Sequence, residues 1–342
     1  MRVLIVKMSS LGDVIHCMPA VTDLKRHIPE VEIDWVVEEG FSDLVRLHPF
    51  VSNVIPIAIR RWRSNWFAHR SEVSEFRRQL KSSHYDVVLD AQGLLKSACV
   101  SKMANGPVRG FDRSSARESI AAWFYNRAVT VGKGQHAVAR QRALFAKTLD
   151  YEVSGSIDYG LKVPQDEEGL PSVFFFHGTT WTTKHWPEAC WLELARLCDQ
   201  EGYRVKLPFG SEVEEQRARR IADHVSSAEL IPPGTLSQLA HELSQATAAV
   251  AVDTGLGHLA TALNIPLVGL YGPTSPILTG FQGPQQISLS DQELACAPCL
   301  NKQCQYPLED GSSTIYPPCF AEMSATRVFQ QLQVQLNVVH KT

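Results

Sequence analysis

The sequence predicts an α/β protein made of two doubly wound, Rossmann-like halves. Three observations predict this fold. Short β-branched runs alternate with longer amphipathic stretches, the alternation stops once near the middle of the chain, and it then restarts. A length of 342 residues agrees with two domains. Two such halves facing one another would leave a cleft at the carboxyl ends of their strands, where open parallel sheets bind ligands.

The predicted elements follow the chain in order. Strands are expected at residues 2–7, 32–39, 53–59, 85–91 and 107–111 in the first half, and at 172–178, 204–210, 228–233, 248–254 and 266–272 in the second. A proline in the first turn, an acidic start with a basic end, and a Thr cap predict helices at 187–201, 212–224 and 236–245. The polar segment 151–171 carries Gly, Ser and Pro and lacks helical periodicity, which places the domain boundary there.

The composition excludes several classes of protein. Hydrophobic residues make up 44% of the chain and charged residues 20%, which excludes a disordered or fibrous polymer. The net charge of −3 leaves only a local patch for binding a polyanion, so no nucleic-acid partner is expected. No apolar run approaches the roughly 18 residues of a membrane span, and the short apolar start does not predict secretion.

The loop after the first strand is the first candidate site. The strand ends at Lys7, and a turn containing Gly12 leads into a helix whose N-terminus carries Asp13. Backbone amides at such a helix start favour an anion. Asp13 could simply cap the helix. Lys7 at the carboxyl end of the strand favours a role in chemistry, because a capping aspartate does not need that neighbour.

The second half offers two loops with phosphate-binding character. Thr179, Thr180 and Lys184 lie between a buried strand and a helix that starts with proline, where hydroxyls, a lysine and a helix N-terminus favour a phosphate. An isolated lysine in such a loop is usually just solvated, but Lys184 is not isolated. Glu214, in the first turn of the next helix, could hold ribose hydroxyls or merely stabilise that turn.

The segment AVAVDTGLGHLATA is the strongest local feature. A strand ends at Asp253, and Gly255 and Gly257 begin a helix whose amides can approach a phosphate closely. The triplet Asp253-Thr254-Gly255 also occurs in aspartic proteases, but that chemistry needs two such aspartates in a β-rich fold. The glycines also match a dinucleotide fingerprint. The next strand lacks the acidic residue that would hold a ribose hydroxyl, so NAD is disfavoured.

Two further clusters suggest partners. Between residues 60 and 81, seven basic residues stand against Glu72 and Glu75, and Trp62, Trp66 and Phe67 are interspersed among them. This composition predicts a site for a polyanion with an apolar part or for a membrane interface, with a solvated basic face as the alternative. The near-zinc spacing of Cys296, Cys299, Cys304 and Cys319 indicates a structural metal, a redox-sensitive pair or simply packed thiols. The sequence contains no Asp-x-Asp motif for a catalytic Mg²⁺.

The motifs DWVVEEGF, YDVVLDAQGLLKSA, TKHWPE, LPFGSEVEEQRARR and VDTGLGHLATAL follow the MRVLIVKMSSLGDV start in a fixed order and spacing. Over roughly residues 1–275 the chain resembles the ADP-heptose:lipopolysaccharide heptosyltransferases of glycosyltransferase family 9. These are inverting, metal-independent enzymes of the GT-B fold. The resemblance implies an acceptor-binding domain at 1–160, a domain at 161–320 that binds ADP-heptose, and a C-terminal helix at 321–342 that returns toward the first domain.

The resemblance also implies an activity. It is transfer of L-glycero-D-manno-heptose from ADP-heptose to the first Kdo of Kdo2-lipid A, without a cofactor, by a cytoplasmic protein in peripheral contact with the inner membrane of a Gram-negative bacterium. Addition of the second heptose is one alternative. A non-catalytic nucleotide-sugar-binding or NAD-binding protein is the other.

On the same resemblance, Asp13 is the general base and Lys7 its catalytic neighbour. The implied donor contacts are Thr179, Thr180, Lys184, Glu214, Asp253, Thr254, Gly255 and His258. The implied acceptor contacts are Ser10, Gly12, Arg60, Arg61, Arg63 and Arg117.

Overall fold

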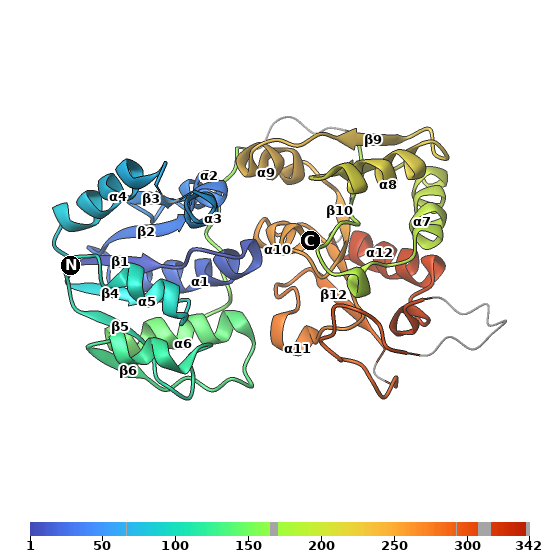
Figure 1. Ribbon diagram of the computed structural model, residues 1–342. Coiled ribbons are helices and arrows are strands. Elements are labelled where there is room, and N and C mark those ends of the chain that lie inside the picture. Colours follow the sequence, from blue (N-terminus) through green and yellow to red (C-terminus); the bar gives the residue numbers. More distant parts are fainter. Residues whose placement is uncertain (66, 165–169, 292, 307–315, 340–342) are drawn as a thin grey trace. The chain divides into compact units, whose positions relative to one another are not determined.

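The computed structural model describes residues 1–65, 67–164, 170–291, 293–306 and 316–339. The chain divides into two compact units, Met1–Lys162 and Val163–Thr342, drawn in blue to green and in yellow-green to red (Figure 1). Each unit contains one six-stranded sheet whose strands are all parallel. The predicted α/β class with two doubly wound sheets is therefore confirmed.

The sheet of the first unit has the strand order β3-β2-β1-β4-β5-β6. Its strands are β1 (Arg2–Val6), β2 (Glu32–Glu38), β3 (Asn53–Ile57), β4 (Val87–Asp90), β5 (Val108–Phe111) and β6 (Arg127–Val129). The order reverses between the neighbours β1 and β4. At such a switch point the loops that leave the two strands diverge, so the crevice at their carboxyl ends is where a ligand is expected.

Helices follow these strands in the first unit. They are α1 (Leu11–His27), η1 (Glu39–Phe41), α2 (Ser42–Arg46), α3 (Ile59–Ser64), α4 (Arg70–Ser82), α5 (Leu95–Ser101), η2 (Ser119–Phe124) and α6 (Ala137–Leu149). Alternate side chains of β1, such as Leu4 and Val6, share one apolar cluster with residues of α3 and α4. Helices α1 and α6 pack on each other. Because strand side chains alternate between the faces of a sheet, both faces of this sheet are buried.

The second unit repeats the arrangement. Its strands are β7 (Ser172–Phe176), β8 (Arg204–Pro208), β9 (Ala228–Ile231), β10 (Ala248–Val252), β11 (Leu267–Tyr271) and β12 (Gln286–Ser290). The order β12-β11-β10-β7-β8-β9 places its switch point between β7 and β10. The helices are η3 (Thr182–Lys184), α7 (Glu188–Gln200), α8 (Glu212–Ala222), α9 (Leu236–Ser244), α10 (Gly255–Ala262), α11 (Pro276–Thr279), η4 (Pro318–Phe320) and α12 (Ala325–Val339).

Every predicted strand is present, and most of them end one or two residues earlier than predicted. The residues that were predicted to end these strands belong instead to the loops that follow. These loops carry polar side chains. Strands β6 and β12 were not predicted. The sequence of β6 is only three residues long and largely exposed, and β12 reads QISLS, so neither has the apolar run that marks a buried strand.

The first unit extends slightly past the predicted division at residue 160 and ends at Lys162. The polar segment 151–162 is packed on this unit. The ring of Tyr151 stacks on His27 with a centroid distance of 4.6 Å. The guanidinium of Arg142, buried beside Asp23 on α1, donates to the carbonyls of residues 154 and 155. This segment is therefore part of the first unit.

Helix α12 packs against α7 and contacts β10, β11 and β12. The return of this helix toward the first domain stays a prediction. Among the helices of the described residues, none combines the length and the apolar character that a bilayer span requires.

Candidate active site

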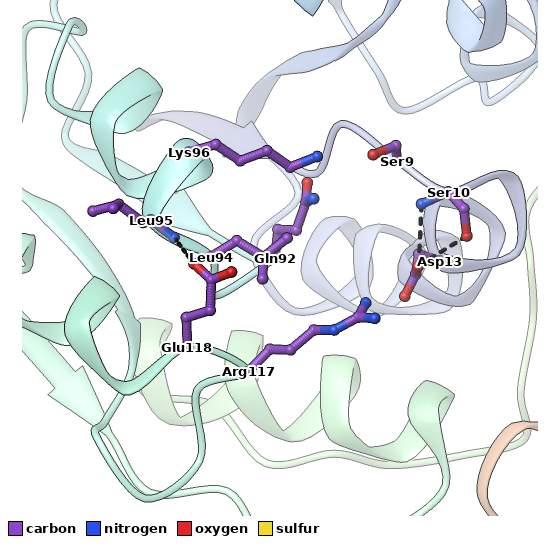
Figure 2. A pocket seen from close by; sticks show the side chains of 9 residues that line it. All are labelled: Ser9, Ser10, Asp13, Gln92, Leu94, Leu95, Lys96, Arg117 and Glu118. Atoms are coloured by element: carbon purple, nitrogen blue, oxygen red, sulfur yellow. Dashed lines mark hydrogen bonds between the residues drawn. The ribbon is translucent and has the colours of Figure 1, made fainter. Parts of the chain in front are cut away.

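A cavity of about 720 Å³ opens in the first unit (Figure 2). It lies at the carboxyl ends of β1, β4 and β5, three neighbouring strands next to the switch point. Its lining comes from the loops that follow these strands and from the first turns of α1 and α5, and consists of Ser9, Ser10, Asp13, Gln92, Leu94, Leu95, Lys96, Arg117 and Glu118. The cavity therefore contains three of the predicted site residues, Ser10, Asp13 and Arg117.

The two oxygens of Asp13 have different surroundings. Asp13 lies in the first turn of α1, and its Oδ2 accepts hydrogen bonds from the N–H and the hydroxyl of Ser10, both at 3.0 Å (Figure 2). Its Oδ1 lies 3.6 Å from Nζ of Lys7. Gly12 lies half-buried in the same turn. Capping of the helix and a role in chemistry are thus compatible, because one oxygen caps and the other remains beside Lys7.

The environment of Asp13 keeps its carboxyl group ionised. Burial raises the pKa, but the positive charge of Lys7 and the hydrogen bonds from Ser10 outweigh that effect and lower the pKa of Asp13 to about 2. The side chain is still 35% exposed. At neutral pH the cavity therefore holds a carboxylate that a ligand can reach and that can accept a proton.

Lys7 is held firmly in place beside Asp13. Its side chain is 5% exposed, and Nζ donates to the carbonyl of Ala91 at 3.2 Å. Its own carbonyl accepts from Nε1 of Trp35 at 3.0 Å. The cation next to Asp13 is therefore fixed by contacts with β2 and with the loop after β4.

A buried carboxylate organises the loop after β4. Asp90 accepts hydrogen bonds from two backbone N–H groups of the following turn, from the hydroxyl of Ser97 and from Tyr125. Complete burial raises the pKa of Asp90 despite these hydrogen bonds. Two residues further on, Oε1 of Gln92 accepts from the N–H of Met8 at 2.8 Å. The loops after β1 and β4 are thus tied together, which sequence reasoning did not show.

Two cations border the cavity near Asp13. Lys96, in the first turn of α5, and Arg117, in the loop after β5, extend their side chains into it (Figure 2). Neither forms an ion pair with another residue in the described ranges. Glu118 instead fixes the loop that carries Arg117, because its Oε2 accepts from the N–H of Leu95 at 2.7 Å. These positions favour an anionic group bound beside Asp13.

Lys96 and Glu118 were not predicted from the sequence. Lys96 follows β4, which neighbours β1 in the sheet, and Glu118 follows β5, which neighbours β4. The carboxyl-end rule that found Asp13 could therefore also have found them.

The three arginines of α3 have different partners and lie outside the set of residues that line the cavity. Arg61 forms ion pairs with Glu39 at 3.0 Å and with Glu72 at 2.8 Å. The guanidinium of Arg60 lies over the ring of Phe41. Arg63 is exposed and has no ion-pair partner among the described residues. The charge of Arg61 is therefore already balanced, whereas Arg63 is available to an anion.

The interpretation of Trp62 as an aromatic residue that faces a partner was wrong. Trp62 is 7% exposed, its ring packs against Phe76, and its Nε1 donates to Glu72 at 3.1 Å. Its position on α3 turns it toward the sheet. Phe67, by contrast, is 84% exposed. Trp66 lies outside the described residues.

In the second unit, the predicted donor residues gather at the switch point between β7 and β10. Nζ of Lys184 lies 2.7 Å from Oδ2 of Asp253, and both side chains are largely buried. Thr179 and Thr180 lie in the loop between β7 and η3. Residues 254 and 255 form the cap and first residue of α10, and His258 on that helix is buried with its ring edge-on to Phe281.

Glu214 approaches the same loop from α8. Its Oε2 accepts from the N–H of Gly210 at 2.8 Å. A Cβ atom on Gly178 would lie 2.3 Å from Oε1 of Glu214, so the carboxyl group lies directly against the backbone that precedes Thr179. The absence of a side chain at position 178 is what allows this close approach. The structure thus brings Glu214 to the loop that contains Thr179 and Thr180.

The four C-terminal cysteines do not form a metal centre in the described part of the chain, where no three His, Cys, Asp or Glu side chains are arranged to hold a metal ion. All four are free thiols. Cys319 is buried, and burial raises the pKa of its thiol to about 12. The alternative of packed thiols describes Cys319 best.

Comparisons with known proteins identify the family and the fold of this chain. The family model described as glycosyltransferase family 9 (heptosyltransferase) matches residues 73–308. Lipopolysaccharide heptosyltransferase 1 of Pseudomonas aeruginosa is 49% identical over 349 aligned residues, which cover 98% of each chain. The structure of E. coli heptosyltransferase WaaC with ADP has a TM-score of 0.85 and 40% identity, covering 98% of this chain and 100% of the other. The same enzyme with ADP-2-deoxy-2-fluoro heptose has a TM-score of 0.82 and 40% identity, covering 97% and 99%.

Proposed function

The chain belongs to glycosyltransferase family 9, the heptosyltransferases, and we propose that it transfers L-glycero-D-manno-heptose from ADP-heptose to the first Kdo sugar of Kdo2-lipid A. The observation that carries the proposal is the 49% identity to a lipopolysaccharide heptosyltransferase 1 along almost the whole of both chains. The E. coli relative bound to ADP-2-deoxy-2-fluoro heptose supports ADP-heptose as the donor.

In the proposed reaction Asp13 is the general base. The acceptor hydroxyl oxygen forms a bond to the anomeric carbon of the heptose while the bond from that carbon to the β-phosphate oxygen breaks. The electron pair leaves with ADP, and the hydroxyl proton passes to Asp13. One displacement inverts the anomeric configuration. The low pKa of Asp13 supports this role, because the carboxylate is ionised and accepts the proton late, as the hydroxyl becomes acidic.

The cavity of the first unit is the proposed acceptor site. Kdo carries a carboxylate and lipid A carries phosphates, so cations are the expected contacts. Arg117 and Lys96 would meet the carboxylate near Asp13. The other proposed acceptor contacts are Ser10, Gly12, Arg60, Arg61 and Arg63. Arg61 would first have to exchange one of its two carboxylate partners.

The loops at the switch point of the second unit are the proposed donor site. Thr179, Thr180 and Lys184 would hold the diphosphate, and Glu214 would hold the ribose. Asp253, Thr254, Gly255 and His258 would contact the heptose and the phosphate. We propose that Lys184 and the N-terminus of α10, rather than a metal ion, stabilise the departing ADP, since the sequence has no Asp-x-Asp motif.

A lipid acceptor implies work at a membrane surface. We propose peripheral contact with the cytoplasmic face of the inner membrane of a Gram-negative bacterium. Arg70, Arg77 and Lys81 recur along one flank of α4, are exposed, and have no ion-pair partner among the described residues. Together with the exposed Phe67 they would suit anionic lipid headgroups.

One experiment tests the activity and both alternatives. Purified protein is incubated with ADP-heptose and either Kdo2-lipid A or its monoheptosylated product, with and without EDTA, and the products are identified by mass spectrometry. We expect one heptose to be added to Kdo2-lipid A in both conditions. Conversion of the heptosylated acceptor alone would indicate second-heptose transfer, and donor binding without any conversion would indicate a non-catalytic protein. Loss of activity in EDTA would contradict the metal-free mechanism.

A further inference from the structure

We propose that Lys302 is a second cation of the donor diphosphate site. This inference rests on the proposed function and deepens it, because it adds a residue that neither the motifs nor the family resemblance assigns. Lys302 lies in the cysteine-containing segment 296–304, to which the proposed function assigns no role. Three features of the second unit carry the inference.

The first feature is the attachment of this segment to the donor loop. The hydroxyl of Thr182 donates to the carbonyl of Lys302 at 2.8 Å, and the hydroxyl of Thr183 donates to the carbonyl of Asn301 at 2.6 Å. These threonines form η3 together with Lys184. Side-chain hydrogen bonds to main-chain carbonyls fix the backbone of both partners. The backbone of Lys302 is therefore fixed beside the loop proposed to bind the diphosphate.

The same segment is also attached to another loop of the second unit. The N–H of Leu300 donates to the carbonyl of Pro273, in the loop after β11, at 2.9 Å. Strand β11 neighbours β10, which ends next to Asp253. Residues 300–302 thus connect loops that leave two strands of the same sheet edge, and this edge is where the donor residues gather.

The second feature is an aromatic ring shared by two cations. Nζ of Lys184 lies 4.6 Å and Nζ of Lys302 lies 5.7 Å from the centroid of the Trp181 ring. Ammonium groups at such distances are attracted to the face of an indole. Trp181 therefore holds the side chain of Lys302 in the same small region as that of Lys184.

The third feature is the charge balance of this region. Lys184 is 2.7 Å from Asp253, so the two residues together add no net charge. ADP gains negative charge as it leaves, and a positive charge that is not already neutralised stabilises it more strongly than a neutral ion pair does. Lys302 is exposed and makes no ion pair with any residue of the described ranges. It supplies the uncompensated positive charge that the Lys184–Asp253 pair lacks.

The test distinguishes the effect of the Lys302 ammonium group from the effect of the backbone contacts of this segment. Lys302→Met removes the charge but keeps an unbranched side chain over Trp181 and keeps the carbonyl that Thr182 contacts. Lys302→Arg keeps the charge. Arg204→Met is the control, because Arg204 is an exposed cation at the start of β8, the opposite end of the strand from the donor loops.

The readouts are the dissociation constants of ADP and AMP by isothermal titration calorimetry, at low and high salt, and kcat and KM for ADP-heptose. We expect Lys302→Met to weaken ADP binding about tenfold, because one partly screened charge near the diphosphate is lost. AMP lacks the β-phosphate, so its binding should weaken less than about threefold. The ADP effect shrinks at high salt. The dissociation constant of ADP for Lys302→Arg should stay within about threefold of the wild-type value. That of Arg204→Met should equal the wild-type value.

Two results would overturn the inference. One is unchanged ADP affinity in Lys302→Met, which is what a purely structural role of the segment predicts. The other is equal weakening of ADP and AMP binding, which would place Lys302 away from the β-phosphate. Both results concern binding alone. They are therefore distinct from a failure of the proposed function, which the wild-type protein would show by adding no heptose.

Discussion

Replacing Asp13 by asparagine and by alanine separates the two roles that this carboxylate has in the structure. Asparagine keeps an oxygen that can accept the hydrogen bonds from Ser10, but it cannot take a proton at neutral pH. Alanine loses both. If Asp13 is the base, the two variants should be equally inactive, and they should differ only in stability.

The magnitudes follow from these contacts. Loss of a positioned general base costs about 10²–10⁴ in rate, or roughly 3–5 kcal/mol in the activation free energy. Both variants leave the buried Lys7 without its carboxylate partner, so that destabilisation is common to them. The alanine variant also loses the helix cap, which costs about 1 kcal/mol and should lower its Tm about 2–4 °C below that of the asparagine variant.

The assays are initial rates of heptose transfer, ADP affinity by calorimetry, and thermal unfolding. ADP affinity should remain near that of the wild type, because Asp13 belongs to the first unit and the proposed donor residues to the second. Asp43→Asn provides the control, since Asp43 also lies in the first turn of a helix of the first unit but does not line the cavity. Turnover within tenfold of the wild type in Asp13→Asn would refute the assignment of the base.

Two further predictions concern the neighbours of the proposed site residues. Lys7 lowers the pKa of Asp13, so kcat/KM of the wild type should show no acid limb from Asp13 between about pH 5 and 8. In Lys7→Met, burial is no longer opposed by the ammonium charge, the pKa of Asp13 rises, and activity should fall as the pH is lowered through this range. Superimposable profiles would show that Lys7 does not tune the base. Gly178→Ala should displace the flexible end of Glu214 and weaken ADP binding about tenfold while changing the free energy of unfolding by less than about 1 kcal/mol, as measured by calorimetry and urea denaturation. Gly134→Ala, with open space around the added Cβ, is the control, and unchanged ADP affinity in Gly178→Ala would argue against ribose binding by Glu214.

The fold could be predicted because buried parallel strands produce apolar runs that the sequence shows directly. The position of the first candidate site followed from the same pattern, since Lys7 and Asp13 flank the end of β1. Short or polar strands such as β6 lack this signal. Their stability comes from the neighbouring strand, which a single segment of sequence does not reveal.

Side-chain surroundings were harder to predict than strand positions. Trp62 was assigned to a partner because it lies among arginines, but the phase of a short helix decides which side chain faces the sheet. Lys96 and Lys302 are close to predicted site loops only because of strand order and loop attachment. Contacts between residues far apart in the chain, such as Thr182 and Lys302, leave no periodic pattern.

The packing of residues 151–162 on α1 and α6 determines where the polypeptide can be divided. A fragment ending at Asp150 would leave the Arg142–Asp23 pair partly uncovered and would lack the tyrosine that stacks on His27. A fragment ending at Lys162 retains these interactions. A fragment designed to measure recognition of the lipid sugar without any nucleotide present should therefore end at Lys162 rather than at Asp150.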